Sequence, residues 1–210
     1  MDPISKALEQ HYSAKFSLHG PSPEGVHWCS DETRMFLRYV NMLNVADFAP
    51  GNPASLLDVG CGYGGLLQFA IGKHVDLDYT GIDVADNMIE WAVGNLPSGR
   101  FLHGDMLDYK FDRQFDYVVC NGILTQKLEA AGLEMDQFAN RLIRQMFSLC
   151  TIGIAFNVMT TKVNYYSNNL YYRNPAELLS WCLSEITPHL KLDHSYPLYE
   201  YTIYLYRNSA

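Results

Sequence analysis

The sequence predicts an α/β protein whose core is a doubly wound, mostly parallel sheet of seven strands with an antiparallel last strand. Short apolar runs alternate with segments of helical periodicity from Ser55 to Asn157, which implies parallel strands joined by right-handed crossovers. The stretch Leu56–Leu67 sets a glycine-dense turn between two apolar runs, as expected for a buried strand, a tight loop and a helix start. The last two predicted strands are only about five residues apart, so they must be antiparallel neighbours.

Residues 1–52 are predicted to form a helical appendage that acts as a lid and is too small to be an independent domain. An amphipathic helix is expected over residues 4–16, followed by a Gly/Pro-rich loop over residues 17–25. Ser30, with Asp31 and Glu32 behind it, is expected to cap a second helix. The apolar face of that helix should comprise Met35, Phe36, Tyr39, Val40 and Leu43.

Residues 53–210 are predicted to form the core, so that the chain is one domain over residues 1–210. The first five strands are expected at Ser55–Val59, Asp78–Ile82, Arg100–His103, Phe115–Cys120 and Ile152–Asn157. A first helix is expected at about 64–73, and a second one starts near Asp86, its expected cap, with Met88, Ile89, Ala92 and Val93 inward. A third follows an apolar stripe from Met135 to Phe147.

The chain after the fifth strand is predicted to contain a tyrosine-rich insert, residues 159–174, and then a last helix and two strands. Asn174 should cap this helix, with Pro175 at its first position and Glu177 as a returning carboxylate. The closing strands are expected at His189–His194 and Glu200–Tyr206.

Composition argues against several classes of partner. The 210 residues are 48% apolar and 18% charged, with a net charge of -8 and no basic run. Such a chain is globular, and it lacks the positive surface with which proteins hold nucleic acids or anionic membranes. No segment is apolar enough for a membrane span, and the N-terminus lacks the features of a signal peptide, so we expect a cytoplasmic protein.

The cysteines and histidines give no sign of a metal site. Five cysteines are scattered without a CxxC pair, which indicates reduced thiols and neither a disulfide framework nor zinc. His11, His19 and His27 are eight residues apart, a spacing that does not place ligands on one helical face.

Four predicted strands end in polar or glycine-rich residues: the turn Gly60–Gly64, then Asp83, Asp105 and Asn121. In an open parallel sheet, ligands bind beyond the carboxyl ends of the strands, where the strand order reverses. The sequence therefore predicts one binding site at this edge of the sheet.

The glycine turn by itself fits two cofactors. The spacing Gly60, Gly62 and Gly65 satisfies the nicotinamide fingerprint, and a carboxylate such as Asp83 would hold ribose hydroxyls in either case. A pyrophosphate would be repelled by Asp58, two residues before the first glycine, whereas a cationic sulfonium and ammonium would be attracted. Asp58 therefore favours S-adenosylmethionine over a nicotinamide dinucleotide.

The stretch Asp58-x-Gly60-x-Gly62-x-Gly64 resembles motif I of the class I S-adenosylmethionine-dependent methyltransferases of the small-molecule type, which have a Rossmann-like fold. The resemblance covers roughly residues 53–160 and the two closing strands. It implies that the methyl donor is S-adenosylmethionine and that the product is S-adenosylhomocysteine.

The resemblance also implies roles for individual residues. The methionine moiety would lie against the loop, the ribose on the carboxylate after the second strand, and the adenine between the residues that follow strands two and three. The implied cofactor residues are Asp58, Gly60, Cys61, Gly62, Asp83, Val84, Met88, Asp105, Met106 and Asn121. Simpler structural interpretations stay open: Asp58 could cap loop amides, Asp105 the next turn, and Asn121 could only form a turn.

Candidates for the acceptor side come from the N-terminal segment and the insert. His19, assisted by Tyr12, is a candidate general base because imidazole titrates near neutrality, although it could simply be a solvated loop histidine. Trp28, Tyr165, Tyr166 and Tyr171 could form aromatic walls for a substrate, or the tyrosines could form a packing or dimer surface. Glu200 at the start of the last strand could reach the same pocket, but the simpler expectation is a solvated acid at the sheet edge.

The predicted function is transfer of a methyl group to N, O or S of a small molecule by in-line displacement, by a chain that could be a homodimer. Alternatives are an NAD(P)-dependent oxidoreductase, a methyltransferase acting on a macromolecule, and a non-catalytic binding protein. Asn121-Gly122-Ile123-Leu124 lacks the Asn/Asp-Pro-Pro-aromatic tetrad, which argues against a macromolecular acceptor.

Overall fold

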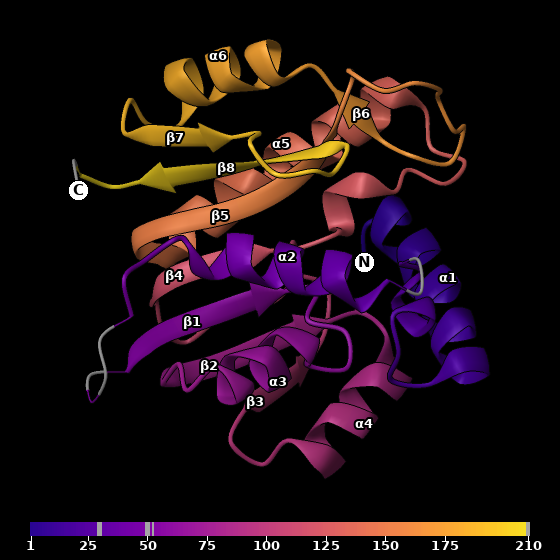
Figure 1. Ribbon diagram of the computed structural model, residues 1–210, viewed down its shortest axis with the longest axis vertical. Coiled ribbons are helices and arrows are strands. Elements are labelled where there is room, and N and C mark those ends of the chain that lie inside the picture. The colour runs from indigo at the N-terminus through magenta and orange to yellow at the C-terminus, as the bar shows by residue number, and fades with distance from the viewer. Residues whose placement is uncertain (29–30, 49–50, 52, 209–210) are drawn as a thin grey trace.

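The computed structural model describes residues 1–28, 31–48, 51 and 53–208. Its sheet has the strand order β3-β2-β1-β4-β5-β8-β7, and the short β6 pairs with β5 beside this path (Figure 1). The strands are β1 (Ala54–Val59), β2 (Leu77–Asp83), β3 (Arg100–His103), β4 (Phe115–Cys120), β5 (Cys150–Thr160), β6 (Tyr172–Arg173), β7 (Leu190–Asp193) and β8 (Glu200–Tyr206).

The predicted sheet topology is confirmed. β1 pairs in parallel with β2 and β4, and β4 with β5, whereas β8 runs antiparallel to both β5 and β7. β5 is longer than predicted because β8 pairs with it from Gly153 to Met159 and β6 pairs with Met159 and Thr160. Residues 159 and 160 therefore belong to the strand and not to the tyrosine-rich insert.

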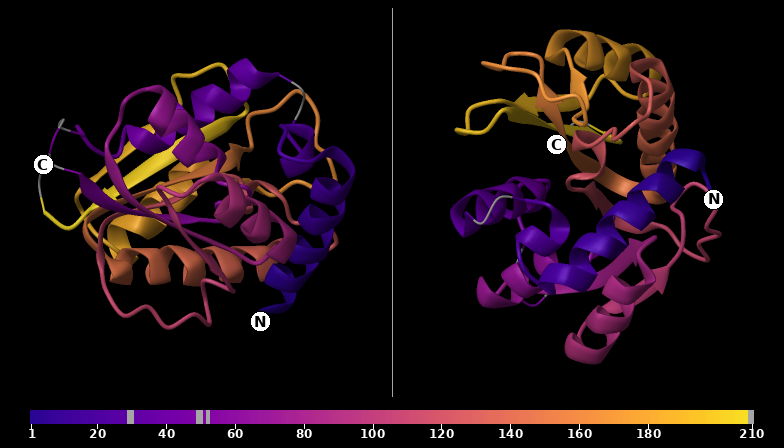
Figure 2. Two further views of the ribbon diagram at one scale, coloured as in Figure 1. Left: turned by 90° about the horizontal axis from the view of Figure 1, so that it is seen from below. Right: turned by 90° about the vertical axis from the view of Figure 1, so that its right-hand side faces the viewer.

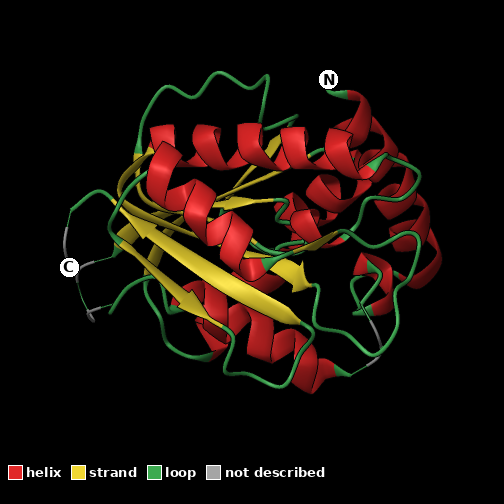
Figure 3. Cartoon of the chain, turned by 90° about the horizontal axis from the view of Figure 1, so that it is seen from above, coloured by secondary structure: helices red, strands yellow, loops and turns green. Residues whose placement is uncertain are grey.

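Helices lie on both faces of the sheet (Figure 3). They are α1 (Pro3–His19), α2 (Glu32–Leu43), α3 (Gly65–Gly72), α4 (Asp86–Asn95), α5 (Gly132–Leu149) and α6 (Pro175–Glu185), with short 3₁₀ turns at Glu24–Val26 and Ile123–Thr125. None of the helices in the described ranges is long and apolar enough to cross a bilayer.

Two cores lie on opposite faces, because successive strand residues point to opposite sides. Leu57, Val118 and Ile154 pack in one cluster with α5 and α6, while Leu56, Val119 and Ala155 pack in the other with α2 and α3. In α5 the predicted stripe is confirmed, because Met135, Phe138, Ala139, Leu142, Ile143 and Met146 are all buried. Packing of the two clusters thus holds the strands in place and determines which of their ends meet at one edge of the sheet.

Three expectations for the apolar helix faces are wrong. Phe36 and Val40 of α2 are 42% and 39% exposed, because Arg38 turns inward beside Met35 and Tyr39. Val93 of α4 is 60% exposed. These side chains lie at the outer flanks of their helices, beyond the stripe that contacts the sheet.

Helix ends differ from the predictions at three places. α1 continues to His19 and ends at Gly20, whose φ of 62° suits glycine. Asp31 caps α2 by accepting from the amides of Thr33 and Arg34, while Ser30 lies outside the described residues. Asp86 is the first residue of α4 and not its cap, a position held by Ala85. The predicted Asn174 cap of α6 is present and accepts from the Ala176 amide.

α1 lies across the carboxyl ends of the parallel strands, at the right of Figure 1, and crosses in front of the sheet in the right panel of Figure 2. Its N-terminus is attached to the core: the Asp2 amide donates to Asp105 Oδ2 over 2.8 Å, and the Asp2 carboxylate pairs with Arg141 at 2.5 Å. Further along, Phe16 packs with Tyr63 and Met88. The helix therefore covers the edge of the sheet where the strand order reverses.

Candidate active site

A cavity lies at the carboxyl ends of β1, β2 and β4 beneath α1, with about 930 Å³ of space that includes open solvent. The strand order reverses between β1 and β4, which is where open α/β sheets bind ligands. All ten residues that the sequence suggests for a cofactor line it: Asp58, Gly60, Cys61, Gly62, Asp83, Val84, Met88, Asp105, Met106 and Asn121.

The glycine loop after β1 is held against the end of β2. The amides of Gly60 and Cys61 both donate to the Ile82 carbonyl, over 2.8 and 3.2 Å. Gly60 has a φ of 74°, and a Cβ there would lie 2.6 Å from the Ile123 side chain. Glycine is needed at this position because the left-handed backbone and the close approach both exclude a larger residue.

Asp83 joins the loop to the start of α4. Its Oδ2 accepts from the Gly62 amide and its Oδ1 from the Ala85 amide, each over 2.8 Å. Burial raises the pKa of this carboxyl, while the amides of Ala85, Gly62 and Val84 oppose the rise. Each oxygen keeps a further lone pair that a ligand hydroxyl could use.

Asp58 lies beneath the loop and is 3% exposed. The Tyr79 hydroxyl donates to its Oδ2 over 2.6 Å, and burial raises its pKa to about 7 in spite of that hydrogen bond. The nearby charge of Asp83 contributes to this raised pKa, after burial. A carboxyl in this state becomes fully ionised only when a cation or a higher pH favours its charge.

Asp105 accepts two backbone hydrogen bonds: Oδ1 from Leu107 over 3.0 Å and Oδ2 from Asp2 over 2.8 Å. It therefore caps the turn after β3 and also holds the start of α1. The capping interpretation, left open by the sequence, is present in the structure, and the residue still lines the cavity.

Asn121 is the one residue of the set whose side chain has no protein partner. It is 9% exposed, and neither its Oδ1 nor its Nδ2 makes a hydrogen bond to the described residues. Buried polar atoms are almost always paired, so an unpaired amide in a cavity wall indicates a ligand that supplies the partner.

The charge of the lining is entirely acidic. Among the described residues, the charged side chains of the cavity are Asp58, Asp83 and Asp105, with no lysine, arginine or histidine. An anionic ligand would be repelled here, and a cationic one attracted.

The acceptor-side expectations are only partly supported by the geometry. Tyr12 and Trp28 line the cavity. His19 is exposed at the far end of α1, outside the lining, because the helix runs three residues further than expected before Gly20 ends it. The geometry therefore does not support His19 as a base.

The three insert tyrosines that were expected to form substrate walls lie away from the cavity. Tyr165 and Tyr166 are 76% and 62% exposed, because their segment extends beyond the end of β5. Tyr171 is buried against α5, where its hydroxyl donates to Asp136 over 2.6 Å. None of the three contributes a wall to this cavity.

Sequence reasoning missed the residues that α1 and α5 bring to the site. Ser5 and Leu8 of α1 and Phe138 and Leu142 of α5 line the cavity with the Ile123 side chain. Glu200 is not a solvated edge acid as expected: it is 3% exposed and paired with Arg38. Arg38 lies at helical spacing from Met35 and Met42. This pattern in the sequence could have indicated that Arg38 points inward and therefore needs an acidic partner.

Comparison with known proteins agrees with this geometry. The sequence profile of the "Methyltransferase domain" family matches residues 56–145. A Mycobacterium tuberculosis protein named "Putative methyltransferase Rv1506c" is 31% identical over 166 residues, which are 78% of this chain and 96% of that protein.

Two solved structures show how widely the fold is shared. Magnesium protoporphyrin IX methyltransferase from Synechocystis PCC 6803 with bound S-adenosylmethionine superposes with a TM-score of 0.68 at 15% identity, covering 99% of each chain. The plantazolicin methyltransferase BpumL, in complex with a pentazolic desmethylPZN analogue and S-adenosylhomocysteine, superposes with a TM-score of 0.62 at 14% identity, covering 99% of this chain and all of that one.

Proposed function

The chain belongs to the class I S-adenosylmethionine-dependent methyltransferases, and we propose that it methylates N, O or S of a small, largely apolar acceptor by in-line displacement. The main support for the proposal is the acidic cavity at the place where the strand order of the sheet reverses, with the unpaired Asn121 side-chain amide in its wall. When bound, the cofactor supplies a methyl group on a sulfonium that is already a strong electrophile. Membership of this family sets aside the nicotinamide oxidoreductase alternative.

The described residues fit this cofactor. Asp83 can accept from ribose hydroxyls with its remaining lone pairs, and Val84 and Met88 offer apolar flanks to an adenine. Asp105 and Met106 also line the cavity, and we propose them as partners of the adenine edge.

The methionine end would lie against the glycine loop. Gly60, Cys61 and Gly62 leave the backbone open there, and Asp58 supplies a negative charge below it. Asn121 can both donate and accept, which suits the ammonium and carboxylate of the methionine moiety.

The acceptor is proposed to be neutral or cationic and largely apolar. The part of the lining outside the cofactor set is dominated by apolar and aromatic side chains: Leu8, Val26, Trp28, Tyr39, Ile123, Phe138 and Leu142. Among the described residues of the lining, none carries a positive charge that would compensate an acceptor phosphate or carboxylate. The porphyrin and plantazolicin enzymes that share the fold also act on small molecules.

Catalysis is proposed to rest on alignment and not on a general base. Tyr12 is one of two tyrosines that the lid brings to the lining, with Tyr39, and burial together with the charge of Asp83 raises the pKa of its phenol. It therefore stays protonated at neutral pH and can donate a hydrogen bond but not remove a proton. Holding two reactants in line can by itself lower the barrier by about 7–11 kcal/mol.

A library screen for S-adenosylhomocysteine release, followed by mass spectrometry of the product, tests the proposal. We expect neutral or cationic apolar compounds among the acceptors and no turnover of matched compounds that bear a carboxylate at the same end. Selective methylation of tRNA or of a protein would contradict the small-molecule assignment.

A further inference from the structure

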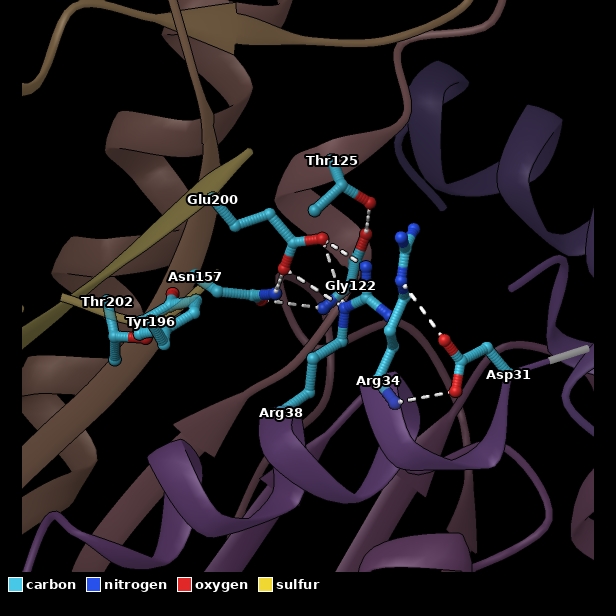
Figure 4. Close-up of polar contacts among 9 residues, drawn as sticks. All are labelled: Asp31, Arg34, Arg38, Gly122, Thr125, Asn157, Tyr196, Glu200 and Thr202. Atoms are coloured by element: carbon cyan, nitrogen blue, oxygen red, sulfur yellow. Dashed lines mark hydrogen bonds and ion pairs between the residues drawn. The ribbon is translucent and has the colours of Figure 1, made fainter. Parts of the chain in front are cut away.

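A chain of buried polar groups leads from α2 across the sheet to the loop after β4 (Figure 4). Arg38 of α2 pairs with Glu200 at the start of β8, its Nε lying 3.0 Å from each carboxylate oxygen. Asn157 of β5 donates from Nδ2 to Glu200 Oε2 over 2.7 Å. The Gly122 amide then donates to Asn157 Oδ1 over 2.9 Å.

The direction of every hydrogen bond in this chain follows from Glu200. An ionised carboxylate can only accept, so Asn157 must turn its Nδ2 toward it. The Asn157 oxygen is then left for the Gly122 amide. The charge of Glu200 therefore decides, through Asn157, whether the backbone after β4 is held.

Trp28 closes the chain into a ring. The Arg38 guanidinium lies 5.0 Å from the Trp28 ring centroid, as in a cation–π contact. The Trp28 indole lies so close to Gly122 that a Cβ there would be 3.4 Å from it, and Gly122 has a φ of 96°. Trp28 and Gly122 both line the cavity, and Gly122 follows the unpaired Asn121.

Stability alone does not account for such a group of residues. Glu200 and Asn157 are 3% and 2% exposed, and the Arg38 side chain is 14% exposed. Desolvating a buried ion pair often costs as much as the pair returns, and apolar replacements of both partners are frequently neutral or stabilising. A role beyond stability is therefore the better explanation for this pair beside a ligand cavity.

We propose that Arg38, Glu200 and Asn157 are positioning residues that fix the acceptor wall formed by Trp28 and Gly122. The proposal rests on the proposed function in one respect, because it takes this wall to face the acceptor. Glu200 orients Asn157, Asn157 holds the Gly122 amide, and Arg38 holds Trp28 against the same glycine.

Amide hydrogen exchange measured by NMR tests this series of hydrogen bonds without cofactor or acceptor. Glu200→Gln puts an NH₂ group in the carboxylate site, which disturbs the Asn157 orientation, so the Gly122 amide should exchange about tenfold faster or more. Adding Asn157→Asp to Glu200→Gln places a carboxylate at residue 157, which restores a hydrogen-bond acceptor for the Gly122 amide. The double variant should return exchange to within about threefold of the wild type.

Unchanged Gly122 exchange in Glu200→Gln would overturn the proposal, as would a double variant no better than the single one. If Glu200→Gln fails to fold, Arg38→Met with Glu200→Leu removes both charges, and the same loss of Gly122 protection is expected in a folded protein. Retained protection in that variant would also overturn it.

Kinetics then separate positioning from a merely structural role. With an acceptor from the screen, Glu200→Gln should lower kcat/KM by about 10- to 100-fold while the Kd for S-adenosylhomocysteine stays within about threefold. Arg144→Met with Glu185→Leu is the matched control, since this exposed ion pair joins α5 to α6 away from the cavity. An equal loss in the control, or equal losses of turnover and cofactor affinity, would contradict the proposal.

Failure of the two proposals can be told apart. Absence of S-adenosylhomocysteine binding by the wild type would reject the proposed function and leave the Gly122 exchange result valid. Normal binding with unaltered exchange would reject only the positioning chain.

Discussion

Two carboxylates of the site differ in what they already bind. Asp83 accepts two backbone amides, whereas Asp58 accepts a single hydroxyl and is more completely buried. Hydrogen bonds from amides favour the charged form, and burial disfavours it. Asp83 is therefore suited to a direct contact with neutral hydroxyls, and Asp58 to a response to charge.

Replacing Asp83 by alanine should weaken S-adenosylmethionine binding by about 1–3 kcal/mol, because a partly buried charged acceptor and the tether on Gly62 are both lost. Isothermal titration calorimetry measures the change. Asp86→Ala is the control, since Asp86 begins the next helix with its side chain 65% exposed. Equal affinities of the Asp83 variant and the wild type would remove Asp83 from the site.

Binding of S-adenosylmethionine should strengthen as the pH rises. The folded protein keeps the Asp58 proton up to a pKa of about 7, and a bound cation lowers that pKa. Cofactor affinity should therefore increase by up to about tenfold between about pH 6 and about pH 8. Asp58→Asn should flatten this dependence, and calorimetry at several pH values with both proteins measures it.

The raised pKa of Asp58 also affects the free energy of unfolding, which it makes fall with rising pH, whereas cofactor affinity increases. Between the ordinary carboxyl pKa of 3.8 and about 7, Asp58 is protonated in the folded chain but ionised in the unfolded one. The unfolded state then binds fewer protons, so this residue makes the free energy of unfolding fall as the pH rises through that interval. A steeper fall in Asp58→Asn than in the wild type would contradict the assignment.

Among the elements, α1 connects the cavity to the rest of the fold through its first turn. Asp2 accepts from the Ile4 amide as the helix cap, pairs with Arg141 of α5, and donates its own amide to Asp105. Ser5, Leu8 and Tyr12 extend from the same helix into the cavity. Release of a bound cofactor should therefore depend on how firmly this turn is held.

Asp2→Ala should destabilise the protein by about 1 kcal/mol through the lost cap, and should also speed the dissociation of S-adenosylhomocysteine. Asn174→Ala is the matched control: it removes the cap of α6, with a similar loss of stability and no change in cofactor dissociation. Stopped-flow displacement and chemical denaturation measure the two effects. Equal dissociation rates for the two variants would show that α1 does not gate the site.

Apart from the short β6, the strands could be predicted from local pattern, because their apolar runs are short and bounded by polar residues. Arg100–His103 and Phe115–Cys120 have the predicted bounds. β5 could not be bounded in this way, since its length depends on pairing with β8 about fifty residues later. Helix faces with few charges, as at Phe36 and Val93, also left the direction of burial ambiguous.

At the scale of the whole molecule, the sequence could place the ten residues proposed for the cofactor around one cavity, because they lie at the ends of parallel strands that share one edge. Trp28 was suggested by the sequence, but the hydrogen bonds that hold the proposed acceptor wall could not be predicted, because they join distant segments. Arg38 and Glu200 are separated by 162 residues and Asn157 and Glu200 by 43, and no local pattern links them. The expectation for Tyr165 and Tyr166 fails for a different reason. A tyrosine-rich composition suggests a pocket, but in the fold these two side chains are exposed and lie away from the cavity.

Ligand binding at the junction of α1, the glycine loop and β4 should stabilise the whole chain. A ligand that binds only the folded state at about 100 times its Kd adds about 2.7 kcal/mol to the free energy of unfolding. For a chain of this length that corresponds to a rise of about 5–11 °C in Tm.

We expect this rise with S-adenosylhomocysteine and none with NADH or NADPH, because their pyrophosphate would meet the acidic lining formed by Asp58, Asp83 and Asp105. Differential scanning calorimetry measures the shift, and Asp83→Ala at the same ligand concentration should show a smaller one. Stabilisation by a nicotinamide dinucleotide equal to that by S-adenosylhomocysteine would contradict the electrostatic account of the site.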